Sequence, residues 1–297
     1  MKDQGVVELL TIASGSSGNC LLLKHGETRL LFDVGISRRR IKEGLETAGV
    51  ALDELTAIVL THEHKDHVCA LPMIRKYNPE IPIYATTGTA RGCRQSYGWS
   101  LPFSRVQADH SFQLGSASLR PFSVRHDANE PVGYRIEVGG LKVAIATDLG
   151  VPQPHVEHAL RGCQVVVLEC NYDAEMLRYG NYPGWLKRRI SSHDGHLSNH
   201  QTGQLLSRIA GPELEHVVLY HLSRENNHPD KAMEAARKGL AGHDRVGLTW
   251  APRKEPGTLM RFQHTPREVK DPRPAKPAIA RRRRPMASLP IQGVLPF

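Results

Sequence analysis

The stretch Ala57-Ile58-Val59-Leu60-Thr61-His62-Glu63-His64-Lys65-Asp66-His67 decides the fold. It opens with an apolar run, which predicts a short buried strand over Ala57–Leu60. Four potential metal ligands follow within six residues. Because alternate residues of an extended chain lie on the same side, His62 and His64 can converge on one ion. Asp66 and His67 begin a helix predicted to end at Tyr77, and they can face a second ion.

More ligands are expected where other strands end. Three polar residues directly follow strand-like runs: His126 after Pro121–Arg125, Asp148 after Val143–Thr147, and His221 after Val217–Tyr220. Together the candidates are five histidines and two aspartates, which suits two divalent ions with one bridging carboxylate. Mixed imidazole and carboxylate ligands indicate zinc or manganese and not a structural zinc held by thiolates. The alternative, surface or hydrogen-bonded core histidines, would explain one isolated histidine better than it explains this run.

The order of predicted elements indicates the fold class. Strands come first, and strands then alternate with helices, twice over, which suits two sheets packed face to face with helices outside. We therefore predict an α/β protein, an αββα sandwich of two mixed β-sheets flanked by helices. The predicted strands are Val6–Ala13, Cys20–Lys24, Arg29–Asp33, Ala57–Leu60, Pro82–Ala85, Leu119–Val124, Tyr134–Val138, Lys142–Thr147, Val165–Glu169, Val217–Tyr220 and Val246–Trp250. The predicted helices are Ser37–Thr47, Asp66–Tyr77, Asp173–Tyr179, Pro183–Ile190, Ser198–Ile209 and Pro229–Lys238.

Composition excludes several classes of protein. The chain has 297 residues, of which 40% are hydrophobic and 23% charged, so it is not fibrous, collagen-like or wholly disordered. It has no apolar run of about 18 residues and no signal-peptide pattern at the start. The five cysteines form no C-x-x-C pair, which is typical of reduced thiols. We expect a cytoplasmic protein with no membrane segment.

The formal charge of +9 is concentrated at the end of the chain. From residue 265 to residue 297, six Arg and two Lys stand against two acidic residues, and seven prolines interrupt any periodicity. We predict one folded domain over residues 1–264 and a disordered, basic, Pro-rich tail over residues 265–297. Within the tail, Arg281–Arg284 would either add nucleic-acid affinity or only solubilise the chain.

The ligand pattern resembles a known family. His62, His64, Asp66 and His67 match the H-x-H-x-D-H motif of the metallo-β-lactamase superfamily, and the remaining candidates fall in the order of its other ligands. The resemblance covers about residues 6 to 250 and implies the metallo-β-lactamase fold with two metal ions, zinc or manganese. By that resemblance, His62, His64 and His126 would hold metal one, Asp66, His67 and His221 would hold metal two, and Asp148 would bridge them.

Further segments look like the YycJ/WalJ-like branch of that superfamily. These are Ala13–Asn19, His126–Ala128, Glu169–Asp173, Asn181–Pro183, Gly195–Asn199 and His221–Asn227. The branch is usually described as bacterial 5′-to-3′ exonucleases on double-stranded DNA. The resemblance therefore implies a metal-dependent phosphodiesterase acting on nucleic acid, most simply DNA, in repair or replication. A metal-bound hydroxide would attack the phosphodiester.

The resemblance also implies catalytic residues. Gly195-His196-Leu197-Ser198 is similar to the catalytic histidine segment of the ribonuclease Z and J relatives, which makes His196 the candidate proton donor. Glu169 resembles the glutamate that accompanies this histidine and would orient it, while Asp66 would serve both binding and catalysis. The alternatives are a phosphate-contacting or capping His196 and a structural Glu169. Ser198 and Asn199 open a predicted helix, so they would either bind substrate phosphate or simply cap the helix.

Two basic patches and one terminal peptide add candidate contacts. Lys187–Arg189 beside Trp185, and likewise Arg38–Arg40, would track a phosphate backbone or be solvated helix faces. The last residues resemble the short peptide by which bacterial repair proteins dock on the DNA polymerase sliding clamp. Its anchors would be Gln292, Leu295 and Phe297, although Gly293 departs from the commoner leucine.

Two other functions fit the same residues. One is an enzyme with the same site that hydrolyses a small thioester or lactone, because a fold alone does not select a substrate. The other is a binding protein with an inert metal site that is recruited through the tail. The complete ligand set argues against the second, since binding does not require an open two-metal site.

Overall fold

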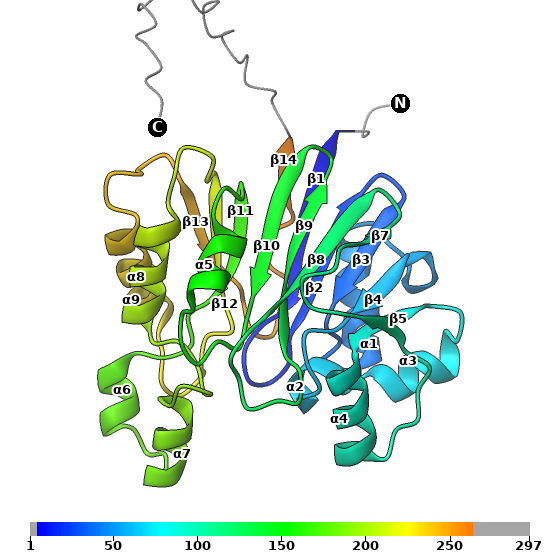
Figure 1. Cartoon of the computed structure of the whole chain (residues 1–297), viewed down its shortest axis with the longest axis horizontal. Coiled ribbons are helices and arrows are strands. Elements are labelled where there is room, and N and C mark those ends of the chain that lie inside the picture. The colour runs from blue at the N-terminus through cyan, green and yellow to red at the C-terminus, as the bar shows by residue number, and fades with distance from the viewer. Residues whose placement is uncertain (1–4, 264–297) are drawn as a thin grey trace, which may run out of the picture. The chain divides into compact units, whose positions relative to one another are not determined.

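The computed structural model describes residues 5–263, which form two seven-stranded sheets packed face to face with helices on both outer sides (Figure 1). In the first sheet the order is β14 (Met260–Gln263), β1 (Val6–Ala13), β2 (Cys20–His25), β3 (Thr28–Phe32), β4 (Ala57–Val59), β5 (Ile83–Thr86) and β6 (Ser104–Val106). In the second it is β13 (Gly247–Trp250), β12 (His216–Tyr220), β11 (Val165–Glu169), β10 (Leu141–Ala146), β9 (Val132–Val138), β8 (Ala117–Ser123) and β7 (Phe112–Leu114).

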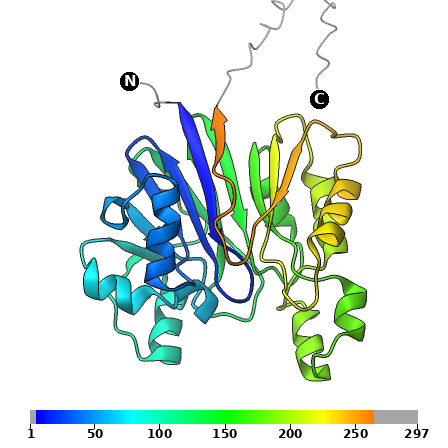
Figure 2. The same cartoon turned by 180° about the vertical axis from the view of Figure 1, so that it is seen from behind.

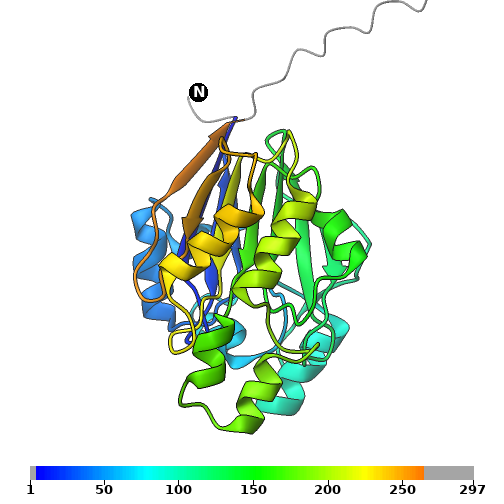
Figure 3. The same ribbon diagram turned by 90° about the vertical axis from the view of Figure 1, so that its left-hand side faces the viewer.

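The helices divide between the two sheets (Figures 1 and 2). On the first sheet's side lie α1 (Arg38–Thr47), α2 (Lys65–Val68), α3 (Leu71–Tyr77) and α4 (Thr87–Tyr97), and a 3₁₀ turn covers Leu52–Glu54. On the second sheet's side lie α5 (Pro154–Leu160), α8 (Asn199–Ile209) and α9 (Pro229–Gly239). The short helices α6 (Ala174–Tyr179) and α7 (Gly184–Ile190) extend beyond the ends of the strands (Figure 3).

Strand alternation builds the layers. In β11, Val165 and Val167 belong to the core between the two sheets, while Val166 and Leu168 pack outward against the helices. Because successive strand residues point to opposite faces, a fully apolar strand serves both layers at once. The outer core of the first sheet likewise includes Ile41 and Leu45 of α1. The predicted αββα sandwich of two mixed sheets is therefore confirmed.

Each sheet is half antiparallel and half parallel. The strands β3, β4, β5 and β6 pair in parallel, and so do β10, β11, β12 and β13. The carboxyl ends of parallel strands meet at one edge of a sheet, where ligand sites of α/β folds usually lie. The two parallel halves therefore deliver their following loops to one end of the sandwich.

Several predicted elements differ from the structure. The helix predicted over Asp66–Tyr77 is two helices, α2 and α3, because Pro72 lacks an N–H and occupies the first turn of the second helix. The helix predicted over Pro229–Lys238 extends one residue further, to Gly239, which packs on the backbone of Gly203 in α8. Helices α4 and α5 and strands β6, β7 and β14 were not predicted.

Helix α4 escaped prediction for a physical reason. Its buried face includes Gly88, Gly92 and Cys93, so it lacks the large apolar periodicity that marks an amphipathic helix. A side chain on Gly92 would overlap the carboxylate of Glu63, and one on Gly88 would overlap Glu130. Small residues here let α4 approach the loop that carries the first histidines.

The predicted tail, with Arg281–Arg284 and the anchors Gln292, Leu295 and Phe297, lies outside the described residues. The domain boundary between residues 264 and 265 stays a prediction. Across residues 5–263, no helix has both the length and the apolar composition needed to span a membrane.

Candidate metal centre

The predicted ligands gather at the end of the sandwich where the parallel strands finish. Asp148 follows β10, Glu169 ends β11 and His221 follows β12, with Glu169 paired to Tyr220 in the strand register. From the first sheet's side, His62 and His64 follow β4, and Asp66 and His67 lie on α2; His126 comes from the loop after β8 of the second sheet. Four groups of side chains, drawn from His62, His64, Asp66, His67, His126, Asp148, Glu169, His196 and His221, bring possible ligand atoms within 4.8 Å of one another.

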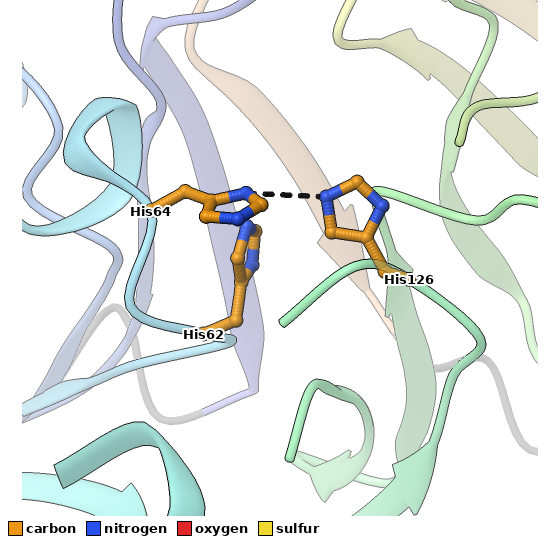
Figure 4. Close-up of side chains that lie close together, drawn as sticks. All are labelled: His62, His64 and His126. Carbon is orange, nitrogen blue, oxygen red and sulfur yellow. Dashed lines mark hydrogen bonds between the residues drawn. The ribbon is translucent and has the colours of Figure 1, made fainter. Parts of the chain in front are cut away.

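One group consists of His62, His64 and His126 (Figure 4). Nδ1 of His64 lies 3.2 Å from Nε2 of His126. The other nitrogen of each ring lies near a carbonyl oxygen, at 3.2 Å from Asp127 and at 2.9 Å from Gly195 respectively. Since a carbonyl oxygen only accepts, those outer nitrogens carry the protons, and the two facing nitrogens are both lone pairs. A cation between them would satisfy both.

His62 completes this group with an unpaired atom. Its Nδ1 lies 3.0 Å from Oγ1 of Thr61, whose hydroxyl donates to Asp33 at 2.8 Å. Nδ1 therefore donates to Thr61, and Nε2 is left as a buried lone pair with no hydrogen-bond partner. Burial lowers the pKa of His62 well below its usual value, and the neighbouring His67 lowers it further. The ring is therefore neutral and able to ligate a metal ion.

The second group is Asp66, His67 and His221. Nδ1 of His67 donates to Oδ2 of Asp33 at 2.8 Å, which turns Nε2 toward Asp66 at 3.7 Å. Nε2 of His221 lies 3.4 Å from Oδ2 of Asp66, and its Nδ1 lies 3.2 Å from Glu169. In both histidines an outer carboxylate fixes the ring and leaves the inner nitrogen for a ligand, which is the usual support of metal-bound histidine.

Asp148 lies between the two groups. Its Oδ2 is 3.3 Å from Nε2 of His67, and its Oδ1 is 3.6 Å from Nε2 of His126. Burial works to raise the pKa of Asp148, but His221 and His67 outweigh it and hold that pKa well below its usual value. The carboxylate is therefore ionised and has one oxygen toward each group.

Backbone geometry places three of these side chains. Asp33, Asp148 and His221 have φ values of 59°, 57° and 58°, in the left-handed region that non-glycine residues rarely adopt. Among residues 5–263, Asp109 is the one other non-glycine residue with positive φ. Each of the three directly follows a parallel strand or lies one residue beyond it, so a sharp turn directs the side chain into the cluster.

The donor set fits divalent metal ions. Ring nitrogens of three imidazoles lie close together in the first group, and His62 keeps a buried nitrogen without a partner. A buried polar atom without a partner is costly, and like-polarity atoms in contact repel unless a cation lies between them. Nitrogen and carboxylate oxygen are ligands that divalent transition metals accept. The cluster is therefore suited to divalent metal binding.

Glu169 and His196 stand beside the cluster. Oε1 of Glu169 accepts from Nδ1 of His196 at 2.7 Å, and Oε2 accepts from the backbone N–H groups of Leu149 and Leu197 at 2.8 and 3.1 Å. Burial works to raise the pKa of Glu169, but the charge and hydrogen bond of His196 outweigh it and lower that pKa. Nε2 of His196 has no hydrogen-bond partner among the described residues, and its side chain is 17% exposed.

Ser198 and Asn199 are used within the fold. The Ser198 hydroxyl accepts from the N–H of Gln201, and the Gln201 side chain accepts from the N–H of Ser198, which forms a capping box for α8. The N–H of Asn199 donates to Tyr172, and its side-chain amide bonds to Asn227. The N–H groups of Ser198, Asn199 and Gln201 are therefore engaged, and substrate binding by the first two stays a prediction.

Sequence reasoning missed the residues that support the ligands. Asp33 holds both His67 and Thr61, yet it was read as the end of a strand. Asn19, in the loop after β1, places Nδ2 3.0 Å from Nε2 of His67. Asp33 could have been predicted from the sequence, because it is a polar residue at the end of an apolar run, the same pattern that led to Asp148.

The two basic patches differ. On α1, Arg38 bonds to Asn78, Arg39 pairs with Glu43 and Arg40 bonds to a backbone carbonyl, which is typical of a solvated helix face. On α7, Nε of Arg189 lies 2.6 Å from Oδ2 of Asp127, next to the ligand His126. This ion pair ties α7 to the edge of the metal cluster.

Sequence comparison identifies the family. Residues 28–222 match the model of the beta-lactamase superfamily domain. The chain belongs to the metallo-β-lactamase superfamily. Within it, the exodeoxyribonuclease YycJ of Bacillus anthracis is 33% identical over 225 residues, covering 73% of this chain and 82% of YycJ. The exodeoxyribonuclease WalJ of Streptococcus pneumoniae is 33% identical over 224 residues, covering 73% of this chain and 81% of WalJ. These matches confirm the YycJ/WalJ-like branch of the metallo-β-lactamase superfamily.

Solved structures agree on the fold. The metallo-beta-lactamase fold protein YhfI of Bacillus subtilis has a TM-score of 0.67 and 16% identity, covering 86% of this chain and all of YhfI. A diphosphatase of the PhnP family has a TM-score of 0.62 and 17% identity, covering 87% of this chain and 98% of that one. At these identities the likeness shows the metallo-β-lactamase fold alone. Family membership and the ligand cluster together identify this chain as a metal-dependent hydrolase.

Proposed function

We propose that this hydrolase is a two-metal phosphodiesterase that acts on nucleic acid as a 5′-to-3′ DNA exonuclease in the cytoplasm, in repair or replication. The observation that carries the proposal is the Glu169–His196 pair, whose free ring nitrogen stands at the edge of the metal cluster. The names of the relatives YycJ and WalJ support a DNA substrate.

The metal ions would be two per chain, zinc or manganese. His62, His64 and His126 would hold the first, Asp66, His67 and His221 the second, and Asp148 would bridge them. When bound, two such ions supply Lewis acidity, which activates water near neutral pH and neutralises charge on phosphoryl oxygens.

The chain's own residues would complete the reaction. Glu169 accepts from Nδ1 of His196, so a second proton, carried on Nε2 by the imidazolium form, is the one that would pass to the leaving oxygen. A leaving alkoxide needs that proton, whereas an acidic leaving group does not. Lys187 and Arg188 on α7, next to the Arg189–Asp127 ion pair, would contact the phosphate backbone at one rim of the site.

Hydrolysis of end-labelled nucleic acid tests the proposal. Duplex DNA, single-stranded DNA and RNA would each be incubated with Mn²⁺ or Zn²⁺ and wild-type protein, Asp66→Ala, or the control Asp53→Ala on the exposed 3₁₀ turn. We expect stepwise loss of nucleotides from the 5′ end of duplex DNA with wild type and Asp53→Ala, and none with Asp66→Ala. Intact nucleic acid together with hydrolysis of a small thioester or lactone would replace the proposal with the alternative hydrolase.

The tail would serve as a docking segment. We propose that residues 1–264 form the catalytic domain and that Gln292, Leu295 and Phe297 bind the DNA polymerase sliding clamp. Limited proteolysis should cut between residues 265 and 297 and spare the rest. Binding of the full chain to immobilised clamp should be lost in Leu295→Ala/Phe297→Ala and kept in the control Arg282→Ala. Equal binding of both variants would contradict the docking role.

A further inference from the structure

A basic pocket lies on α4, outside the metal cluster. It has a volume of about 310 Å³ and is lined by arginines from two elements, Arg91 and Arg94 on α4 and Arg105 on β6. Its remaining lining includes the hydroxyl residues Thr87 and Ser100, and it contains no acidic residue.

The three guanidinium groups have no counter-ion. None of them makes an ion pair or a side-chain hydrogen bond with the described residues, and all three arginines are exposed. By contrast, Arg39 and Arg208 elsewhere on the surface pair with glutamates. Three like charges converging on one hollow repel each other, and an anion would relieve that repulsion.

The floor of the pocket is anchored. Trp99 and Phe103 are half-buried and pack against the outer core of the first sheet. Trp99 also stacks on Tyr97 with ring centroids 4.6 Å apart. The walls that hold the arginines are therefore part of the packed fold and form a defined site.

Helix α4 joins this pocket to the metal loop. Its inner face meets Glu63 at Gly92, and Glu63 lies between His62 and His64 in the chain. Arg91 and Arg94 are on the other side of the same helix, among its exposed positions. A helix with its side chains is about 10–12 Å wide, so the pocket lies roughly that far from the metal loop.

Figures 1 and 2 show α4 and α7 projecting at the same end of the sandwich, on either side of α2. Helix α7, with its cations, therefore lies on one side of α2, and helix α4, with the pocket, lies on the other. At roughly 10–12 Å from the metal loop, the pocket is within a few nucleotides of the cluster along a bound strand.

We propose that the Arg91–Arg94–Arg105 pocket binds a backbone phosphate of the nucleic-acid substrate a few nucleotides from the reacting phosphodiester. The inference rests on the proposed nuclease function, since it names a contact of that same substrate. Arginine forks match phosphate oxygens, and the contact is to the backbone, so it is independent of base sequence.

Binding of labelled duplex DNA tests the pocket separately from catalysis. The parent protein carries Asp66→Ala so that the DNA is not degraded during the measurement. The pocket variant carries Arg91→Ala/Arg94→Ala in addition. Alanine keeps the helix, and the control is Arg237→Ala on α9, an exposed arginine without an ion pair in the described contacts. Affinity is measured by fluorescence anisotropy between 50 and 200 mM salt.

We expect the pocket variant to bind about tenfold or more weakly at about 0.1 M salt, with its log–log salt slope reduced by about 0.9, the value for one lost phosphate contact. Arg91→Lys/Arg94→Lys should retain most of the affinity. Arg237→Ala should bind like the parent. Affinity and slope equal to those of the Arg237→Ala control would overturn the pocket, as would an absence of duplex binding by the parent protein.

Hydrolysis of bis(p-nitrophenyl) phosphate separates the two proposals. This small diester reaches the metal cluster without spanning α4, so Arg91→Ala/Arg94→Ala in the otherwise wild-type chain should hydrolyse it at the wild-type rate. If wild type and the pocket variant digest duplex DNA equally well at limiting DNA, the proposed phosphate contact is wrong and the proposed nuclease function is retained. If wild type binds duplex DNA through the pocket but does not cleave it, the proposed nuclease function is wrong and the proposed phosphate contact is retained.

Discussion

The carboxylate of Glu169 accepts a hydrogen bond from Nδ1 of His196 at 2.7 Å, while the backbone N–H groups of Leu149 and Leu197 hold its other oxygen. Glu169 is fully buried, so its position is set by the fold and in turn sets the position of the ring. This leaves Nε2 of His196 as the ring atom that is open to a substrate.

His196→Ala should therefore lower hydrolysis of DNA by roughly 10²- to 10⁴-fold, the usual contribution of a general acid. The same variant should hydrolyse bis(p-nitrophenyl) phosphate within a few-fold of wild type, because p-nitrophenolate leaves without a proton. Steady-state rates on the two substrates check this, with metal content measured alongside. Equal losses on both substrates would indicate phosphate contact instead of proton donation.

Asp33→Asn should weaken metal binding by about 10- to 100-fold, the usual effect of removing the carboxylate behind a ligating histidine. Asp33 accepts from Nδ1 of His67 and from the hydroxyl of Thr61. An asparagine keeps the size of the side chain but removes its charge. Competition with a fluorescent zinc chelator measures the affinity, and Asp53→Asn is the surface control. Unchanged affinity would show that Asp33 only stabilises the turn.

Metal removal should lower the thermal stability. The candidate ligands come from both sheets and meet only in the folded chain, so an ion would bind the folded and not the unfolded chain. Such binding stabilises the fold by about 2.7 kcal/mol at 100 times the dissociation constant. A domain of this size should then lose several degrees in Tm on treatment with a chelator. Differential scanning calorimetry checks this. Asp66→Ala should show a smaller chelator effect, and an equal shift in both proteins would point to metal bound elsewhere.

Three buried thiols should resist alkylation. Burial raises the pKa of Cys93 and Cys170 to about 12 and that of Cys163 to about 11. At pH 8 these groups are protonated, and thiols react as thiolates. Mass spectrometry after iodoacetamide treatment should find all three unmodified in the native protein and modified after unfolding in urea. Rapid native labelling of any of them would mean that its surroundings open readily.

The sequence allowed the candidate ligands to be predicted because each lies close after a strand. His126, Asp148 and His221 stand within three residues of a strand end, and that position is visible in the sequence itself. Their supporting contacts are not. Glu169 meets His221 because β11 and β12 pair in one register, with Glu169 opposite Tyr220, and the loop between α7 and α8 brings His196 to the same carboxylate. Such pairing depends on residues about 50 positions apart.

Helix α4 shows the other reason for a missed element. Apolar periodicity marks helices that bury large side chains, whereas α4 buries Gly88, Gly92 and Cys93 against Glu63 and Glu130. Its sequence therefore reads as a loop. The Arg91–Arg94–Arg105 pocket was hidden with it, because Arg105 comes from β6, another element without a clear signal.

The left-handed backbone at Asp33, Asp148 and His221 costs the fold some stability and in return directs three side chains into the metal cluster. Each conformation costs a non-glycine residue about 1 kcal/mol, and glycine would adopt it without that cost. Replacement by glycine would remove that cost but also the side chains that build the cluster, and the bonds that Asp33 accepts from His67 and Thr61 would be lost. Engineering this enzyme for heat resistance should leave these turns untouched and seek its gains elsewhere.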